Sequence, residues 1–143
     1  NLGLETLHVR MKQYCENAEV VAEYLNNHEK VNSVNYPTLK GNPNYELAKK
    51  YLPDGCSGVI TFNIKGGKPN AIKFMDSLKL ATNCVHVADI RTCVLHPASA
   101  THRQLTDEQL VACGIDAGMI RLSVGLENAD DIIDDLRQAF ENI

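Results

Sequence analysis

The chain has 143 residues, a formal net charge of -4 and a pI near 5.7. This length suits one ordinary domain with a real core, and the acidic balance offers no basic surface for nucleic acid. No apolar run approaches the length of a membrane span. We therefore expect a soluble single domain over residues 1–143, with neither nucleic acid nor a membrane as partner.

The first predicted element is a long helix from about residue 4 to residue 28. Its apolar residues recur at steps of three and four, which predicts one core-facing stripe. The stripe consists of Leu7, Met11, Tyr14, Ala18, Val21 and Leu25. A short strand over residues 31–36 follows, and Asn44 is then expected to cap a helix from Tyr45 to about Leu52.

The clearest strand covers residues 57–65, where Ile60, Phe62 and Ile64 alternate on one face. Next come a helix over residues 69–79 and two short extended runs. The extended runs cover residues 80–85 and 91–96.

Capping signals mark the helices in the last third of the chain. Thr106 and Gln109 have the spacing of a capping box, and Gly114 supplies a matching stop, so a two-turn helix is expected. A strand over residues 118–124 follows, and Asn128 is expected to cap a final helix. The acidic side of that helix is predicted to be a solvated surface and comprises Asp130, Asp131, Asp134 and Asp135.

This order of elements predicts an α/β fold of the two-layer α+β kind. Several strands are separated by tight turns rather than by crossover helices. We therefore expect a mostly antiparallel sheet of four or five strands with helices on one face.

Arg121 is the residue that most needs an explanation. In an extended segment, Ile120 and Leu122 face one way, while Met119, Arg121 and Ser123 face the other. A strand arginine near a chain reversal is a plausible clamp for an anion, since its planar fork of donors matches a carboxylate. The alternative is an arginine that extends to water at a sheet edge.

Other common chemical motifs are missing. The sequence contains no phosphate-binding glycine loop, no GxSxG elbow and no paired-carboxylate site. None of the nine lysines stands in a setting that marks it as a Schiff-base former. The chain by itself is expected to be catalytically incomplete, and its lack of an initiator methionine suggests a piece of a longer protein.

The cysteines do not form a recognisable framework. Five are scattered without a CxxC pair, which argues against structural disulfides and for a reducing cytoplasm. Cys93, His96 and His102 are close in sequence, but their spacing matches no standard zinc motif. No metal site is predicted.

Four segments together resemble the C-terminal portion of the Cys/Met metabolism family of pyridoxal-phosphate (PLP) enzymes. They are residues 3–11 with Asn17-Ala18, Tyr36-Pro37, residues 96–102 (HPASATH), and residues 120–127 (IRLSVGLE). Residues 84–96 are most similar to the O-acetylhomoserine sulfhydrylase branch. They depart from it at His86, where that branch usually has Asn, and at Ala88, where Gly is usual; Ala100 likewise replaces a usual Thr or Met.

The resemblance implies the C-terminal domain of a fold-type-I PLP-dependent transferase. The large domain that binds PLP through a Schiff-base lysine would lie upstream, so no catalytic residue is expected here, and this chain alone should bind no cofactor. The resemblance further implies that Arg121 binds the substrate α-carboxylate, with His86 at a neighbouring contact position. Asp89, Thr101 and His102 are expected to support the loops around the site.

For function, the resemblance implies an O-acetylhomoserine sulfhydrylase of methionine and cysteine biosynthesis, active as a homotetramer with its own N-terminal domain in place. The substrates would be O-acetylhomoserine and sulfide or a thiol. The alternatives are a cystathionine γ-synthase or γ-lyase, a methionine γ-lyase, and a non-catalytic module that binds amino acids.

Overall fold

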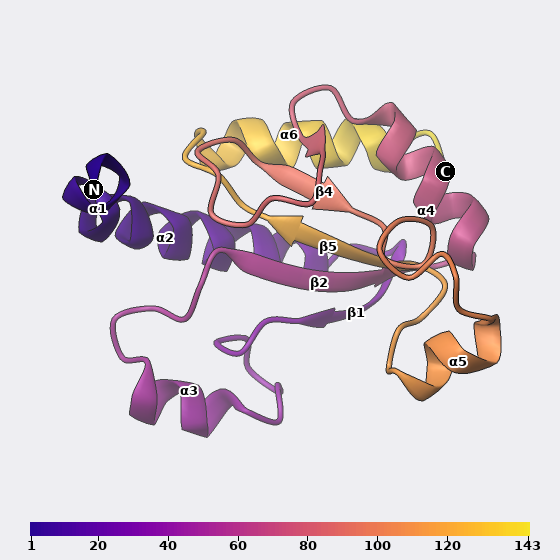
Figure 1. The fold of residues 1–143 in the computed structure, drawn as a ribbon, viewed down its shortest axis with the longest axis horizontal. Helices are drawn as coiled ribbons and strands as arrows, with labels where there is room; N and C mark the ends of the chain where they lie inside the picture. The colour runs from indigo at the N-terminus through magenta and orange to yellow at the C-terminus, as the bar shows by residue number, and fades with distance from the viewer.

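The computed structural model describes all residues, 1–143, and consists of one five-stranded sheet with six helices (Figure 1). In chain order the elements are α1 (Leu2–Glu5), α2 (Leu7–Asn26), β1 (Val31–Asn35), α3 (Tyr45–Tyr51), β2 (Val59–Ile64), α4 (Gly67–Ser77), β3 (Thr82–Asn83), β4 (Cys93–Leu95), α5 (Asp107–Ala112), β5 (Met119–Ser123) and α6 (Ala129–Phe140). None of the helices combines the length and the hydropathy that crossing a bilayer requires.

The sheet has the strand order β1-β2-β5-β4-β3. The pairs β1/β2, β2/β5 and β4/β5 are antiparallel, and only the short pair β3/β4 is parallel. The mostly antiparallel sheet predicted from the tight turns is therefore confirmed. Its last strand in sequence, β5, lies at the centre, so residues of β5 have a strand on either side.

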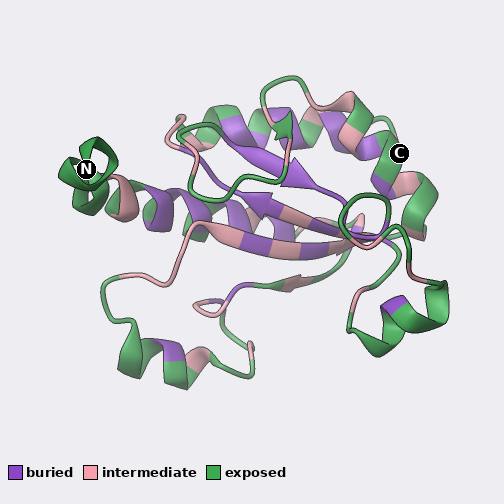
Figure 2. Ribbon diagram, in the orientation of Figure 1, coloured by how far each residue is buried: buried purple, intermediate pink, exposed green.

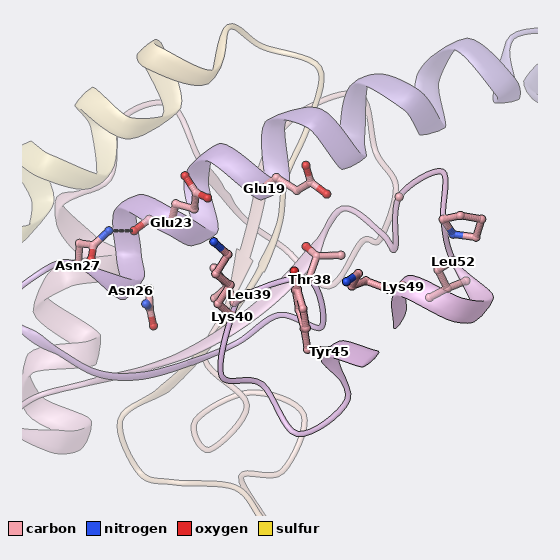
Figure 3. Close-up of a pocket in the computed structure, with 12 residues that line it drawn as sticks. Glu19, Glu23, Asn26, Asn27, Thr38, Leu39, Lys40, Tyr45, Lys49 and Leu52 are labelled. Atoms are coloured by element: carbon pink, nitrogen blue, oxygen red, sulfur yellow. Dashed lines mark hydrogen bonds between the residues drawn. The ribbon is translucent and has the colours of Figure 1, made fainter. Parts of the chain in front are cut away.

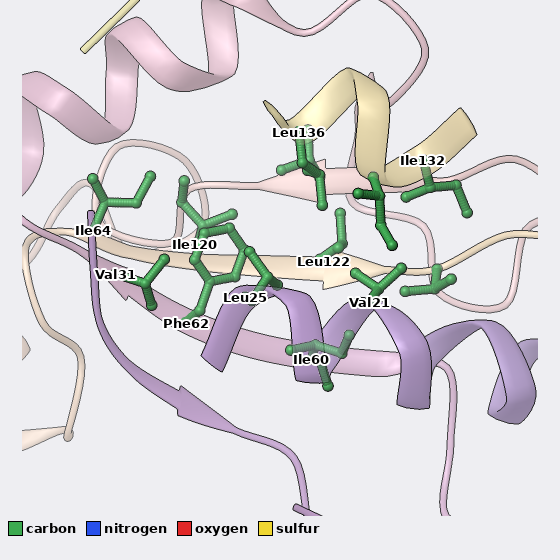
Figure 4. Close-up of a cluster of buried hydrophobic side chains, with 14 of the residues drawn as sticks. Val21, Leu25, Val31, Ile60, Phe62, Ile64, Ile120, Leu122, Ile132 and Leu136 are labelled. Carbon is green, nitrogen blue, oxygen red and sulfur yellow. The ribbon is translucent and has the colours of Figure 1, made fainter. Parts of the chain in front are cut away.

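One face of the sheet carries the core. Alternate residues of β2 and β5 are fully buried there, where α2 and α4 pack against the sheet and α6 packs against both of these helices. Figure 4 shows Val21 and Leu25 of α2, and Ile132 and Leu136 of α6, gathered around these strands. The opposite face, which we call the open face, carries no helix. Helices α1, α3 and α5 lie at the periphery and are mostly exposed (Figure 2).

The long N-terminal helix differs from its prediction at its start. The chain breaks from helical geometry at Thr6, with φ -108° and ψ 4°, so α1 and α2 are separate helices. Leu7 is exposed and Met11 is half-buried, whereas the stripe is buried from Tyr14 onward. The periodic pattern therefore predicted the helix correctly but extended the core too far toward the N-terminus.

The three capping predictions had different outcomes. The Thr106–Gln109 capping box is present in full, and the Asn128 side chain accepts the N–H of Asp130 as expected. Asn44 is the N-cap residue of α3 as expected, but its side chain makes no capping bond. Asn42 instead accepts the N–H of Asn44 at 2.9 Å, so a local turn presets the entry to α3.

Asp135 was also predicted wrongly, because it is buried rather than solvated. It lies three residues after Ile132 on α6, which places both on the packed side of the helix. Its carboxylate accepts hydrogen bonds of 2.8–3.0 Å from three successive backbone groups, the N–H groups of Lys79, Leu80 and Ala81. These bonds anchor the segment after α4 to α6.

Candidate functional site

Arg121 lies at the centre of β5, paired with Thr61 of β2 on one side and Leu95 of β4 on the other. Its neighbours Ile120 and Leu122 are fully buried in the core, so alternation directs Arg121 to the open face. The side chain is half-buried. The strand alternation predicted from the sequence is therefore confirmed, and a cation occupies the middle of the face without helices.

The guanidinium of Arg121 is only partly satisfied by the protein. One terminal nitrogen, Nη2, donates to the carbonyl oxygen of Val85 at 2.8 Å. The Nε atom is buried and has no hydrogen-bond partner. A buried donor without a partner costs about 1–3 kcal/mol, and a guanidinium carries five donors. Such a group is suited to binding an anion, which would supply the missing acceptor.

Val85 belongs to the loop between β3 and β4, residues 84–91, which we call the 84–91 loop. The loop is held in a conformation that L-residues rarely adopt, because Ala88 has a φ of 58°. The N–H of Ala88 donates to the Ser123 hydroxyl at 3.2 Å, and its carbonyl accepts from the Tyr14 hydroxyl at 3.1 Å. The left-handed backbone conformation of Ala88 costs roughly 1–2 kcal/mol, and these two hydrogen bonds hold the residue in it.

His86 and Asp89 meet within the same loop. The Nδ1 atom of His86 lies 3.1 Å from Oδ2 of Asp89. The other carboxylate oxygen of Asp89 accepts from the backbone N–H of Arg91 at 3.0 Å and from its Nε at 3.3 Å. The bonds from Arg91, followed by that from His86, hold the pKa of Asp89 well below its usual range. The carboxylate thus braces the loop and orients the exposed imidazole.

A second set of contacts, not predicted from the sequence, fixes the base of the loop. The Glu127 carboxylate accepts from the Thr92 backbone N–H at 2.7 Å and from its hydroxyl at 2.9 Å. Asn17 of α2 donates to the carbonyls of Gly125 and Glu127 at 3.0 and 2.8 Å. A Cβ at Gly125 would lie 2.5 Å from the Thr92 nitrogen, so only glycine allows this approach. No periodicity could reveal these contacts, because they join distant parts of the chain.

Thr101 and His102 lie away from the 84–91 loop, since they follow the other end of β4. Thr101 Oγ1 is 2.9 Å from His102 Nδ1, a purely local contact. The buried His96 ties this segment down instead, with Nδ1 2.7 Å from Ser99 Oγ and Nε2 2.8 Å from the Ala117 carbonyl. The structure therefore groups Arg121, His86 and Asp89, and it does not bring Thr101 or His102 to them.

A surface hollow of about 750 Å³ lies elsewhere (Figure 3). It lies between α2, α3 and residues 38–40, with acidic side chains of Glu19 and Glu23 on one side and the amines of Lys40 and Lys49 on the other. None of the predicted site residues lines it. Its mixed, open lining has no unsatisfied buried donor, so we place the candidate site at Arg121.

No lysine is placed to hold a cofactor covalently. Eight of the nine lysines are exposed. The ninth, Lys30, is half-buried and donates to the carbonyls of Phe140 and Ile143 at 2.7 and 2.8 Å. The donor set at Arg121 fits a carboxylate, whereas the chain offers no desolvated amine.

Comparison with known proteins gives consistent results. The sequence profile of a family described as Cys/Met metabolism PLP-dependent enzyme matches residues 1–141. The O-acetyl-L-homoserine sulfhydrylase of Leptospira meyeri is 47% identical over 99% of this chain and 32% of its own length. The L-methionine gamma-lyase of Treponema denticola is 45% identical over 99% of this chain and 35% of its own.

A solved structure is equally similar. The crystal structure of a Campylobacter jejuni protein, described as an O-acetylhomoserine (thiol)-lyase with N'-pyridoxyl-lysine-5'-monophosphate, superposes with a TM-score of 0.92. It is 44% identical, and the match covers 98% of this chain and 33% of that one. This chain therefore spans about a third of the length of the curated relatives that it matches.

Proposed function

Because this chain belongs to the Cys/Met metabolism family of PLP-dependent enzymes, we propose that it is the substrate-binding domain of an O-acetylhomoserine sulfhydrylase. The complete enzyme transfers the aminocarboxypropyl group of O-acetylhomoserine to sulfide or a thiol, in the biosynthesis of methionine and cysteine. Its cofactor-binding domain, with the lysine that carries PLP, is another part of the same polypeptide. Residues 1–143 form one domain of that enzyme.

The observation that carries this proposal is the unpartnered Nε of Arg121. Val85 takes one of the donors of the guanidinium and leaves the buried Nε free. The α-carboxylate of an amino-acid substrate supplies two acceptor oxygens in one plane, which suits two parallel N–H donors. Arg121 is thus the residue that binds the substrate carboxylate.

The chemistry follows from that binding. PLP, when bound, supplies an electron sink for bond cleavage at the substrate Cα. Arg121 fixes the carboxylate and thereby limits rotation about the Cα bonds, which sets the bond that is broken. Its own position is fixed by β5 and by the Val85 carbonyl. Orientation, rather than proton transfer, is the contribution of this side chain.

His86 is the second substrate contact in this proposal. Asp89 holds its Nδ1 side, and Nε2 makes no hydrogen bond within the protein. That nitrogen is free to meet a substrate group next to the carboxylate. Asp89 acts through His86 and the loop, as a positioning residue. Thr101 and His102 support the turn after β4 rather than the substrate.

Apolar side chains exposed near the site support a covering domain. Val85, Val87 and Ile90 of the 84–91 loop are more than half exposed, at 55–60%. Leu2 and Leu4 of α1 are exposed as well. We propose that the PLP-binding domain and the other subunits of a homotetramer cover these side chains.

Five free cysteines support a reducing cytoplasm as the compartment.

A methionine γ-lyase is the second candidate, because the lyase of Treponema denticola is almost as similar as the sulfhydrylase of Leptospira meyeri. Assays of the complete protein with O-acetylhomoserine plus sulfide, with methionine and with cystathionine separate these functions. We expect kcat/KM to be highest for O-acetylhomoserine. A preference for methionine or cystathionine would assign the chain to a lyase or to cystathionine metabolism instead.

The role of Arg121 is tested in the same assays. Arg121→Lys should lower kcat/KM about 100-fold, because a point charge loses the bidentate geometry. Arg137→Lys, on the helix side of the sheet and paired with Asp134, is the matched control and should keep full activity. Equal activities of the two variants would refute the carboxylate assignment.

Calorimetry with homoserine esters on this chain alone tests the binding-module alternative, which predicts tight binding without PLP.

A further inference from the structure

Two cysteines meet where the 84–91 loop leaves the sheet. Cys84 follows β3 directly, and its backbone N–H donates to the Val94 carbonyl at 3.0 Å, which extends the parallel pairing of β3 and β4. Cys93 is the first residue of β4. The two Sγ atoms are 2.8 Å apart. A disulfide bond is about 2.05 Å long, so a shift of under about 1 Å brings the sulfurs to bonding distance.

We propose that Cys84 and Cys93 form a reversible disulfide, a redox modification site that fixes the start of the 84–91 loop. The backbone pairing already aligns the two residues, so little chain entropy opposes the bond. The proposal concerns only residues of this chain and does not depend on which member of the enzyme family it belongs to.

The two thiols differ in access, which sets the order of the steps. Cys93 is 1% exposed, and burial, followed by the contact with Cys84, raises its pKa to about 12. Cys84 is half-buried in this domain and is therefore the more accessible of the two thiols. A low-molecular-weight disulfide such as oxidised glutathione is the oxidant. The Cys84 thiolate attacks one of its sulfurs and releases one glutathione thiolate, which takes up the proton that Cys84 has lost.

The second step closes the bond. Cys93 loses its proton and attacks Sγ of Cys84, and the second glutathione leaves as a thiol with that proton. Two protein thiols are thus oxidised to one disulfide, and one glutathione disulfide is reduced to two thiols. Excess reduced glutathione reverses both steps.

The consequence for the site comes from the position of Cys84 in the chain. The next residue, Val85, accepts the hydrogen bond from Arg121. A covalent link from Cys84 to β4 therefore ties the Val85 carbonyl to the sheet that carries Arg121. Oxidation should make the 84–91 loop more rigid, because the closed ring removes conformations from the open loop.

A metal ion is the competing occupant, since ligand atoms of Cys84, His86 and Cys93 all lie within 4.8 Å of one another. Two thiolates on one tetrahedral zinc ion are roughly 3.8 Å apart, given Zn–S bonds of about 2.3 Å. The observed 2.8 Å separation is too short for that arrangement and close to that of a bond. The distance between the sulfurs therefore favours the disulfide.

The test uses the protein as its gene encodes it, treated with a chelator and then with excess oxidised or reduced glutathione. Free thiols are blocked at acid pH, and peptides are analysed by mass spectrometry. We expect oxidation to remove both Cys84 and Cys93 from the free thiols, with one linked peptide pair that has lost two hydrogen atoms. Reduced glutathione should restore both thiols. Hydrogen exchange of residues 85–91 should be slower in the oxidised protein.

Three results would overturn the proposal. In the first, both thiols stay free while the exposed Cys113 is glutathionylated, which shows that the oxidant worked. In the second, Cys84 ends as a stable mixed disulfide with glutathione. In the third, the protein before chelation holds one zinc ion that Cys84→Ser removes, which makes the cluster a metal centre.

Variants separate the bond from general oxidation. Cys84→Ser should abolish the linked peptides and the slower exchange of the loop, whereas Cys113→Ser should keep both. Because Cys93 is buried, Cys93→Ser is used only if its circular dichroism matches that of the unmodified protein. The experiment on the unmodified protein decides the proposal even if both variants of the pair fail to fold.

Discussion

The two faces of the sheet are built from the same strands but are stabilised in different ways. On the helix-covered face, Ile60, Phe62 and Leu122 are fully buried against three helices. On the open face, Arg121 keeps a buried Nε without a partner, and the adjoining loop contains Ala88 in a left-handed conformation. The covered face carries most of the buried core, whereas the open face holds an unsatisfied donor and backbone strain, which are typical of binding sites.

The sharpest test of this comparison is a matched pair of truncations. Phe140 is 1% exposed, and its ring lies 3.9 Å from that of His28 and 4.5 Å from that of Phe74. Phe140→Ala should lower the free energy of unfolding by about 3–5 kcal/mol, measured by urea denaturation. Met119→Ala on the half-buried open face should cost less than about 1.5 kcal/mol. Similar losses would show that the open face contributes as much to stability as the core.

Removing the Asp135 carboxylate, a polar anchor on the covered side, should cause the next largest loss of stability. Asp135→Ala leaves three partly buried N–H groups without their acceptor, so we expect a loss of about 2–3 kcal/mol in thermal or urea unfolding. Asp134→Ala removes a neighbouring carboxylate that is 65% exposed and should change stability by less than about 1 kcal/mol. If Asp135→Ala is as mild as the control, the buried carboxylate is not an anchor.

A substitution that relieves backbone strain in the 84–91 loop should stabilise the protein, whereas the preceding substitutions destabilise it. Ala88→Gly relieves a positive φ and should raise the free energy of unfolding by about 0.5–1 kcal/mol, after the entropy cost of glycine. Ala100→Gly is a matched change at an exposed turn where φ is not positive, and it should lower stability by a few tenths of a kcal/mol, roughly the entropy cost alone. A loss of stability in Ala88→Gly would mean that the loop is not strained.

The smallest effect concerns pH. Burial lowers the pKa of His28 below 6.5 in the folded protein. The unfolded chain then binds a proton more readily, so stability is full above the unfolded pKa and declines as pH falls through about 6.5 toward the folded pKa. In His28→Phe this contribution to the pH dependence should vanish. Unfolding of both proteins at a series of pH values between about 7.5 and 5 measures the difference. Parallel curves would contradict the assignment.

Much of the fold could be predicted because its signals are local. The alternation of Ile60, Phe62 and Ile64 predicted β2 and its buried face. The same rule predicted that Arg121 and Ile120 of β5 lie on opposite faces of the sheet. The Thr106–Gln109 capping box was correct because both partners lie within one helical turn. Asn44 was placed correctly before α3, but its side chain makes no capping bond, and its backbone N–H donates locally to Asn42 instead.

Within the site, the sequence by itself determined that a cation stands on the face of β5 away from the core, since side-chain alternation is a property of any strand. Only the tertiary structure decided which groups contact Arg121 and its loop. Val85 reaches Arg121 across 36 residues, Tyr14 reaches Ala88 across 74, and Asp135 reaches Lys79 across 56. Periodicity encodes which way a side chain points, but a contact between distant segments exists only once the packed core has brought their backbones together.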